Sequence, residues 1–130
     1  MKRIDIKSSK TNAVLSFLNL TSRDFEISYQ SSHFSAQMKV LNDQEERPLQ
    51  DFFAHLAQNS KGWQGELSWT PMFEEYIKIS ATVDKTGHVA LKIVFDGYSH
   101  TEPWFAETIL HTELGLLEKI SKDVHNFFSA

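Results

Sequence analysis

The sequence predicts an α+β fold, in which an antiparallel β-sheet of about eight short strands, arranged in two meanders, carries two packed helices. Apolar and polar residues alternate with a period of two in two separate runs along the chain. Each run is followed by one segment in which apolar residues recur at helical spacing. The 130 residues fit a single domain spanning residues 1–130.

The first run contains four expected strands. They cover residues 3–7, 12–20, 25–30 and 34–40. The polar segments at residues 21–24 and 30–33 have the length of hairpin turns, which is too short for a crossover connection. We therefore expect these strands to be antiparallel neighbours in chain order.

The first helix is predicted from an apolar stripe at i, i+3, i+4, i+7 and i+8. The stripe consists of Leu49, Phe52, Phe53, Leu56 and Ala57. Pro48 stands where a first helical residue is expected, because a missing N–H costs nothing at that position. Gly62 follows just beyond the expected end.

The second run shows the same pattern of four strands followed by one helix. Its expected strands cover residues 65–70, 77–83, 89–95 and 104–111. Gly87 closes a turn at residues 84–87, where glycine accepts a positive φ. A final helix is predicted from a second apolar stripe, with Thr112 as its N-cap. The stripe consists of Leu116, Leu117, Ile120, Val124, Phe127 and Phe128.

The inner face of the sheet follows from the same alternation, since every second side chain of a strand points to one face. We expect it to be covered by the two helices. Its predicted members are Phe25, Ile27, Phe34, Ala36, Met38, Ile77, Ile79, Val89, Leu91 and Ile93.

Composition excludes several functional classes. The chain has no cysteine, which rules out disulfides, a cysteine nucleophile, thiolate zinc sites and iron–sulfur clusters. No histidine pair has metal-ligand spacing and no glycine-rich phosphate loop occurs, so we expect no cofactor and no tightly bound metal. A net charge of −4 disfavours nucleic acid and anionic membranes as partners. Without an apolar run after the basic N-terminus, a cytoplasmic location is expected.

One loop could support catalysis. Asp96, His100 and Glu102 come close together in the sequence, and a histidine beside carboxylates is suited to acid–base chemistry. The same residues fit a polar hairpin loop that ends at a proline. A small enzyme using these side chains is therefore an alternative that the sequence leaves open.

Acidic loops and loop aromatics are the candidate partner-binding residues. Tryptophan and tyrosine are enriched at interface hot spots, and carboxylates can complement a basic partner. Core packing of the aromatics and plain solvation of the charges are the competing interpretations. The candidates are Asp43, Glu45, Glu46, Trp63, Glu74, Glu75 and Tyr98.

Motifs in the second half of the chain carry a resemblance to a known group of proteins. They are Trp63-Gln64-Gly65-Glu66-Leu67, Asp84-Lys85-Thr86-Gly87-His88-Val89-Ala90-Leu91, Pro103-Trp104, Glu113-Leu114-Gly115-Leu116-Leu117 and the terminal Phe127-Phe128. Over residues 60–128 the chain resembles small bacterial WapI-type immunity proteins and a related bacterial family of unknown function. The resemblance implies a non-enzymatic protein that binds and neutralises a toxin domain. A small-molecule ligand-binding domain is the other alternative.

Overall fold

The computed structural model describes residues 2–42, 45, 48–71, 76–97 and 101–129. It contains two antiparallel four-stranded sheets and two α-helices, which confirms the predicted α+β class. The first sheet is formed by β1 (Arg3–Lys7), β2 (Val14–Leu18), β3 (Asp24–Gln30) and β4 (Ser35–Leu41). The second is formed by β5 (Leu67–Trp69), β6 (Ile77–Val83), β7 (His88–Asp96) and β8 (Phe105–Glu113).

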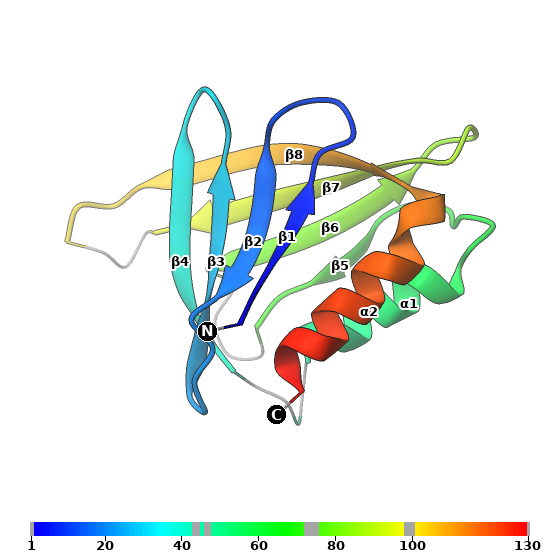
Figure 1. Cartoon of the computed structure of the whole chain (residues 1–130). Coiled ribbons are helices and arrows are strands. Elements are labelled where there is room, and N and C mark those ends of the chain that lie inside the picture. Colours follow the sequence, from blue (N-terminus) through cyan, green and yellow to red (C-terminus); the bar gives the residue numbers. More distant parts are fainter. Residues whose placement is uncertain (1, 43–44, 46–47, 72–75, 98–100, 130) are drawn as a thin grey trace.

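Both sheets are meanders with strands in chain order. Helix α1 (Leu49–Gln58) separates the two meanders, and α2 (Leu117–Phe128) ends the chain. Figure 1 shows one sheet in front of the other with their strands crossing, while the two helices lie side by side at one edge. The apolar faces of both sheets and both helices therefore share one core.

Phe17 of β2 lies at the centre of this core. Its ring centroid is 6.3 Å from that of Phe25, 6.0 Å from that of Phe53 and 6.4 Å from that of Phe127. These contacts join the first sheet to α1 and to α2. Phe53 and Leu56 of α1 are fully buried, as expected for the predicted helical stripe.

The predicted inner face is buried, apart from a half-buried Ala36 and one clear error, Phe34. Phe34 precedes β4 at the tip of the β3–β4 hairpin and is 39% exposed. Its ring packs against Tyr29 at a centroid distance of 5.2 Å. The alternation places Phe34 on the same face as Ala36 and Met38, as predicted. However, β4 starts only at Ser35, so Phe34 lies in the hairpin turn, where the core does not cover it.

The predicted starts of the helices need correction. Thr112 is not an N-cap: it lies in β8 opposite Val89 and is 1% exposed. A 3₁₀ turn, Leu114–Leu116, follows β8, and α2 then starts after Leu116 without a side-chain cap. Pro48 is the N-cap of α1 rather than its first helical residue. Gly87 does adopt the expected positive φ, at 88°. Within the described residues, no helix is long and apolar enough to cross a membrane.

Candidate functional site

Most of the predicted partner-binding residues lie outside the described residues. These are Asp43, Glu46, Glu74, Glu75 and Tyr98. Glu45 is described and is exposed. His100 of the possible catalytic group is also outside the described residues, whereas Asp96 ends β7 and Glu102 is exposed in the loop before β8. Because His100 lies outside the described residues, the arrangement of the three members of that group is not part of the described geometry.

Trp63 is half-buried and packs against the core. Its indole Nε1–H donates a hydrogen bond to the carbonyl oxygen of Ala81 at 3.1 Å. The side chain thus ties the segment after α1 to strand β6. The polar group of its side chain is used inside the protein, so Trp63 has a structural role, which is one of the two interpretations that the sequence left open.

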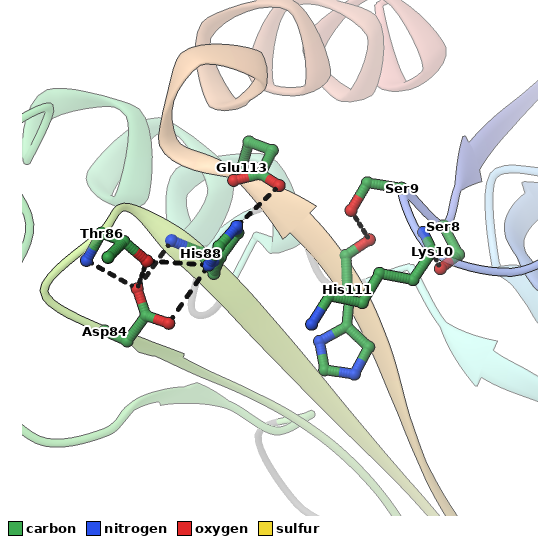
Figure 2. Close-up of polar contacts among 8 residues, drawn as sticks. All are labelled: Ser8, Ser9, Lys10, Asp84, Thr86, His88, His111 and Glu113. Carbon is green, nitrogen blue, oxygen red and sulfur yellow. Dashed lines mark hydrogen bonds and ion pairs between the residues drawn. The ribbon is translucent and has the colours of Figure 1, made fainter.

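A polar cluster connects the β6–β7 turn to the end of β8 (Figure 2). The Asp84 carboxylate accepts hydrogen bonds from the Thr86 hydroxyl at 2.8 Å, the Thr86 backbone N–H at 2.9 Å and the His88 backbone N–H at 3.0 Å. The His88 ring lies 3.3 Å from Asp84 Oδ2 through Nδ1 and 3.5 Å from Glu113 Oε1 through Nε2. One imidazole, at the start of β7, therefore lies between a carboxylate of the β6–β7 turn and a carboxylate at the end of β8.

These hydrogen bonds stabilise the charged form of Asp84. The Thr86 hydroxyl contributes most, followed by the backbone N–H of His88, and together the donors lower the pKa of Asp84 from 3.8 to about 2. The side chains of Asp84, His88 and Glu113 are between a third and slightly over half exposed. We interpret the cluster as a clamp on the turn, since the Leu114 backbone N–H also bonds to the carbonyl oxygen of Gly87 at 3.0 Å.

The outer edge of β8 is bonded at one end. The carbonyl oxygen of His111 accepts hydrogen bonds from the Ser9 backbone N–H at 2.9 Å and from the Ser9 hydroxyl at 3.3 Å (Figure 2). Among the backbone hydrogen bonds of the described residues, none joins the outer edge of Phe105, Glu107 or Ile109 to another strand. The open stretch of β8 therefore runs from Phe105 to Ile109.

Large apolar side chains are exposed along this stretch. Phe105 is 63% exposed and Ile109 is 50% exposed, although both lie in a strand. Phe34, at the tip of the neighbouring β3–β4 hairpin, and Ile109 line one cavity of about 270 Å³ between the two sheets. Its lining is completed by Thr11, Asn12, Ala13, Tyr29, Ser31, Ser32, His33, Thr108 and His111. Ile109 belongs both to the open edge and to the lining of this cavity. We call the open edge, its exposed apolar side chains and the adjoining cavity the β8 surface.

Sequence reasoning missed the β8 surface, although a signal was present. Phe105 and Ile109 lie on one face of the strand, while Ala106 and Leu110 lie on the other. An edge strand with apolar residues on both faces exposes one set of them to solvent, unless something covers that face. The sequence alone could not show that β8 is an edge strand.

A second cavity, of about 520 Å³, lies between α1 and the edge strand β5. Its lining mixes aromatic, hydroxyl, histidine and carboxylate side chains. It consists of Pro48, Asp51, Phe52, His55, Leu67, Ser68, Trp69 and Thr70. Within the described ranges, no three histidine, aspartate or glutamate side chains are arranged to hold a metal ion. The volume and the mixed lining are typical of a pocket for a small organic molecule.

Comparison with known proteins gives a family but no activity. A comparison with curated proteins finds no significant match. Among solved structures, the chain is similar to one described as crystal structures of Trypanosoma bruciei MRP1/MRP2, with 11% sequence identity and a TM-score of 0.46. That similarity covers 97% of this chain and 83% of the other. The model of a family of unknown function, DUF6228, matches residues 6–130, so the chain belongs to the DUF6228 family.

Proposed function

We propose that this protein is a non-enzymatic binding protein, and specifically an immunity protein that binds and neutralises a bacterial toxin domain in the cytoplasm. The observation that carries the proposal is the β8 surface, where Phe105, Ile109 and Phe34 are exposed beside an open strand edge. Clustered apolar side chains on a protein surface commonly mark interaction sites. Aromatic anchors of this kind dominate the energy of protein–protein interfaces.

The charge of the molecule supports a basic protein as the partner. The net charge is −4, and Glu107 lies between Phe105 and Ile109 on the same face of β8. Glu45 and the other acidic loop residues predicted from the sequence would add to the attraction. Many toxins that cut nucleic acid are basic, and an acidic inhibitor accelerates encounter with such a domain.

The experiment that tests this function uses the toxin domain encoded next to the gene. Cells that express the toxin domain should grow when this protein is co-expressed, and the two purified proteins should form a complex. Phe105→Ser and Ile109→Ser should mainly accelerate dissociation, because apolar anchors act on the off-rate. Leu116→Ser is the matched control, since Leu116 is 44% exposed but lies after β8 in the 3₁₀ turn.

Two outcomes would contradict the proposal. The absence of both a neighbouring toxin gene and a protective effect would remove the immunity function. Equal dissociation rates for the parent, Phe105→Ser and Ile109→Ser proteins would show that binding uses another surface.

The cavity between α1 and β5 favours a second candidate function, a small-molecule ligand-binding domain. Its volume of about 520 Å³ falls within the range of ligand pockets, and Trp69 in its lining offers a fluorescent reporter. A ligand should raise the melting temperature of the parent protein and change the Trp69 emission. Ser68→Phe, which places a ring in the cavity from exposed Ser68 without adding a second tryptophan there, should abolish both effects.

A further inference from the structure

The open stretch of β8 presents backbone groups in a fixed pattern. Gly97 donates its N–H to the carbonyl oxygen of Trp104 at 2.8 Å, whereas His111 uses its carbonyl oxygen to bond Ser9 on the outer side. Because successive residues of a strand direct their backbone groups to opposite sides, Phe105, Glu107 and Ile109 direct theirs outward with His111. A partner that satisfies these N–H and C=O groups together must itself be extended.

The side chains of the same three residues lie on one face of the second sheet. Across β7 they face Asp96, Val94 and Lys92, respectively. Glu107 thus has an apolar residue opposite it on β7, apolar neighbours two positions away along β8 and solvent on its open side. A positively charged side chain on an added strand would complete this row.

We propose that the open edge of β8 binds an extended strand of the toxin domain. Every second residue of that strand faces the same side as Glu107, and these residues are apolar, basic and apolar in turn. The added strand places its basic residue beside Glu107 and its apolar residues beside Phe105 and Ile109. This inference rests on the proposed function, since it names the mode by which the toxin domain is held. The Ser9 hydrogen bonds to His111 set one limit of the added strand.

A second copy of this chain fits the edge less well. The antiparallel register that places Phe105 beside Ile109 of another copy also places the two Glu107 carboxylates directly opposite each other. Like charges in opposite positions destabilise a strand pair. The edge is therefore better suited to a different, basic strand than to itself.

The test uses two blocked peptides and isotope-labelled protein in an NMR titration. Each peptide consists of threonine except for valine at its second and sixth positions, and the fourth position is lysine in one peptide and glutamate in the other. The lysine peptide should shift the amide signals of Phe105, Glu107 and Ile109, and should bind about threefold to fivefold more tightly than the glutamate peptide.

Charge reversal makes this test specific. Glu107→Lys should invert the preference between the two peptides, whereas Glu118→Lys, at an exposed position of α2, should leave it unchanged. The inference would be overturned by equal binding of both peptides, by shifts confined to another surface, or by no shift at millimolar peptide. Dimerisation of the parent protein through β8 would likewise overturn it.

A second comparison separates this inference from the proposed function. Ile109→Pro removes the outward N–H without breaking the β7–β8 ladder, and Ile109→Thr retains that N–H at the same position. The proline variant should bind the toxin domain more weakly than the threonine variant. If both variants bind the toxin domain equally tightly and both neutralise it, the added strand is refuted, whereas the immunity function remains supported.

Discussion

At the scale of single residues, two aromatic side chains, Phe17 and Trp63, connect elements that are separate in the sequence. Phe17 contacts aromatic rings from β3, α1 and α2, although those residues are far apart in the sequence. Trp63 links the segment after α1 to β6 through its indole N–H. Both residues are large aromatics, but Phe17 fills the core, whereas Trp63 holds a loop against it.

Ile79→Ala should destabilise the protein by about 2–5 kcal/mol, because Ile79 is 0% exposed and its truncation leaves a cavity. Urea unfolding at neutral pH measures this change. Thr82→Ala, at an exposed position of the same strand, is the control and should change stability by less than about 0.5 kcal/mol. A loss below about 0.5 kcal/mol for Ile79→Ala would place that side chain outside the core.

Trp63→Phe and Trp63→Ala separate the two contributions of that side chain. The phenylalanine variant loses the hydrogen bond to Ala81 and part of the indole ring but keeps an aromatic contact with the core, so we expect it to cost about 1 kcal/mol or somewhat more. The alanine variant also loses the packing of the ring on the core and should be clearly less stable. Thermal unfolding measures both. A parent-like melting temperature for Trp63→Ala would instead favour the partner-binding role predicted from the sequence.

At the scale of elements, the connections determine which strand edges are open. The β1–β2 loop covers the edge of β8 at His111 through Ser9, and α1 lies against β5 at the other edge of the second sheet. The β7–β8 connection starts at Gly97, whose N–H bonds to the carbonyl oxygen of Trp104. The entry to β8, and with it the position of Phe105, depends on this close approach.

Gly97→Ala should therefore distort the start of β8. A Cβ atom at position 97 would lie 2.3 Å from Trp104 Nε1 and 2.6 Å from its Cδ1, and Trp104 is itself stacked on Phe95. We expect a loss of about 1–3 kcal/mol of stability in urea unfolding. Gly115→Ala is the matched control, because a Cβ there meets no atom within 4 Å. Equal stability of the two variants would mean that Trp104 moves aside freely.

At the scale of the whole molecule, carboxyl groups in both halves of the chain determine how stability decreases in acid. The pKa of Asp5 is lowered chiefly by the Ser16 hydroxyl, and the pKa of Glu26 chiefly by the Asn19 side chain. The pKa of Asp84 is lowered to about 2. A carboxyl whose pKa falls on folding stabilises the native state above its unfolded pKa and loses that contribution as the pH decreases.

Stability should consequently be constant near neutral pH and decrease as the pH falls below the ordinary carboxyl pKa values. For Asp84 the decrease should extend from about 4 to about 2, between the unfolded and folded pKa values. Urea unfolding midpoints across this range measure the effect. Asp84→Asn removes the titrating group and should give a shallower decrease than the parent. Identical pH profiles would show that the turn hydrogen bonds do not depend on the charge of Asp84.

The sequence by itself determined the α+β class, the order of strands and helices, and most of the core. Alternation identifies a buried face locally, as at Ile77 and Ile79, because a strand's side chains switch faces at each residue. A turn such as that at Gly87 is equally local, since it depends on one backbone conformation.

Only the tertiary structure decided which side chains meet and which edges stay open. Thr112 has the residue type of a cap, yet β8 continues through it because its pairing with β7 extends to Glu113. Phe34, Phe105 and Ile109 resemble core residues in sequence, but a hairpin tip and an edge strand expose them. Exposure depends on what the rest of the chain leaves uncovered, and a pattern within one segment carries no information about its distant neighbours.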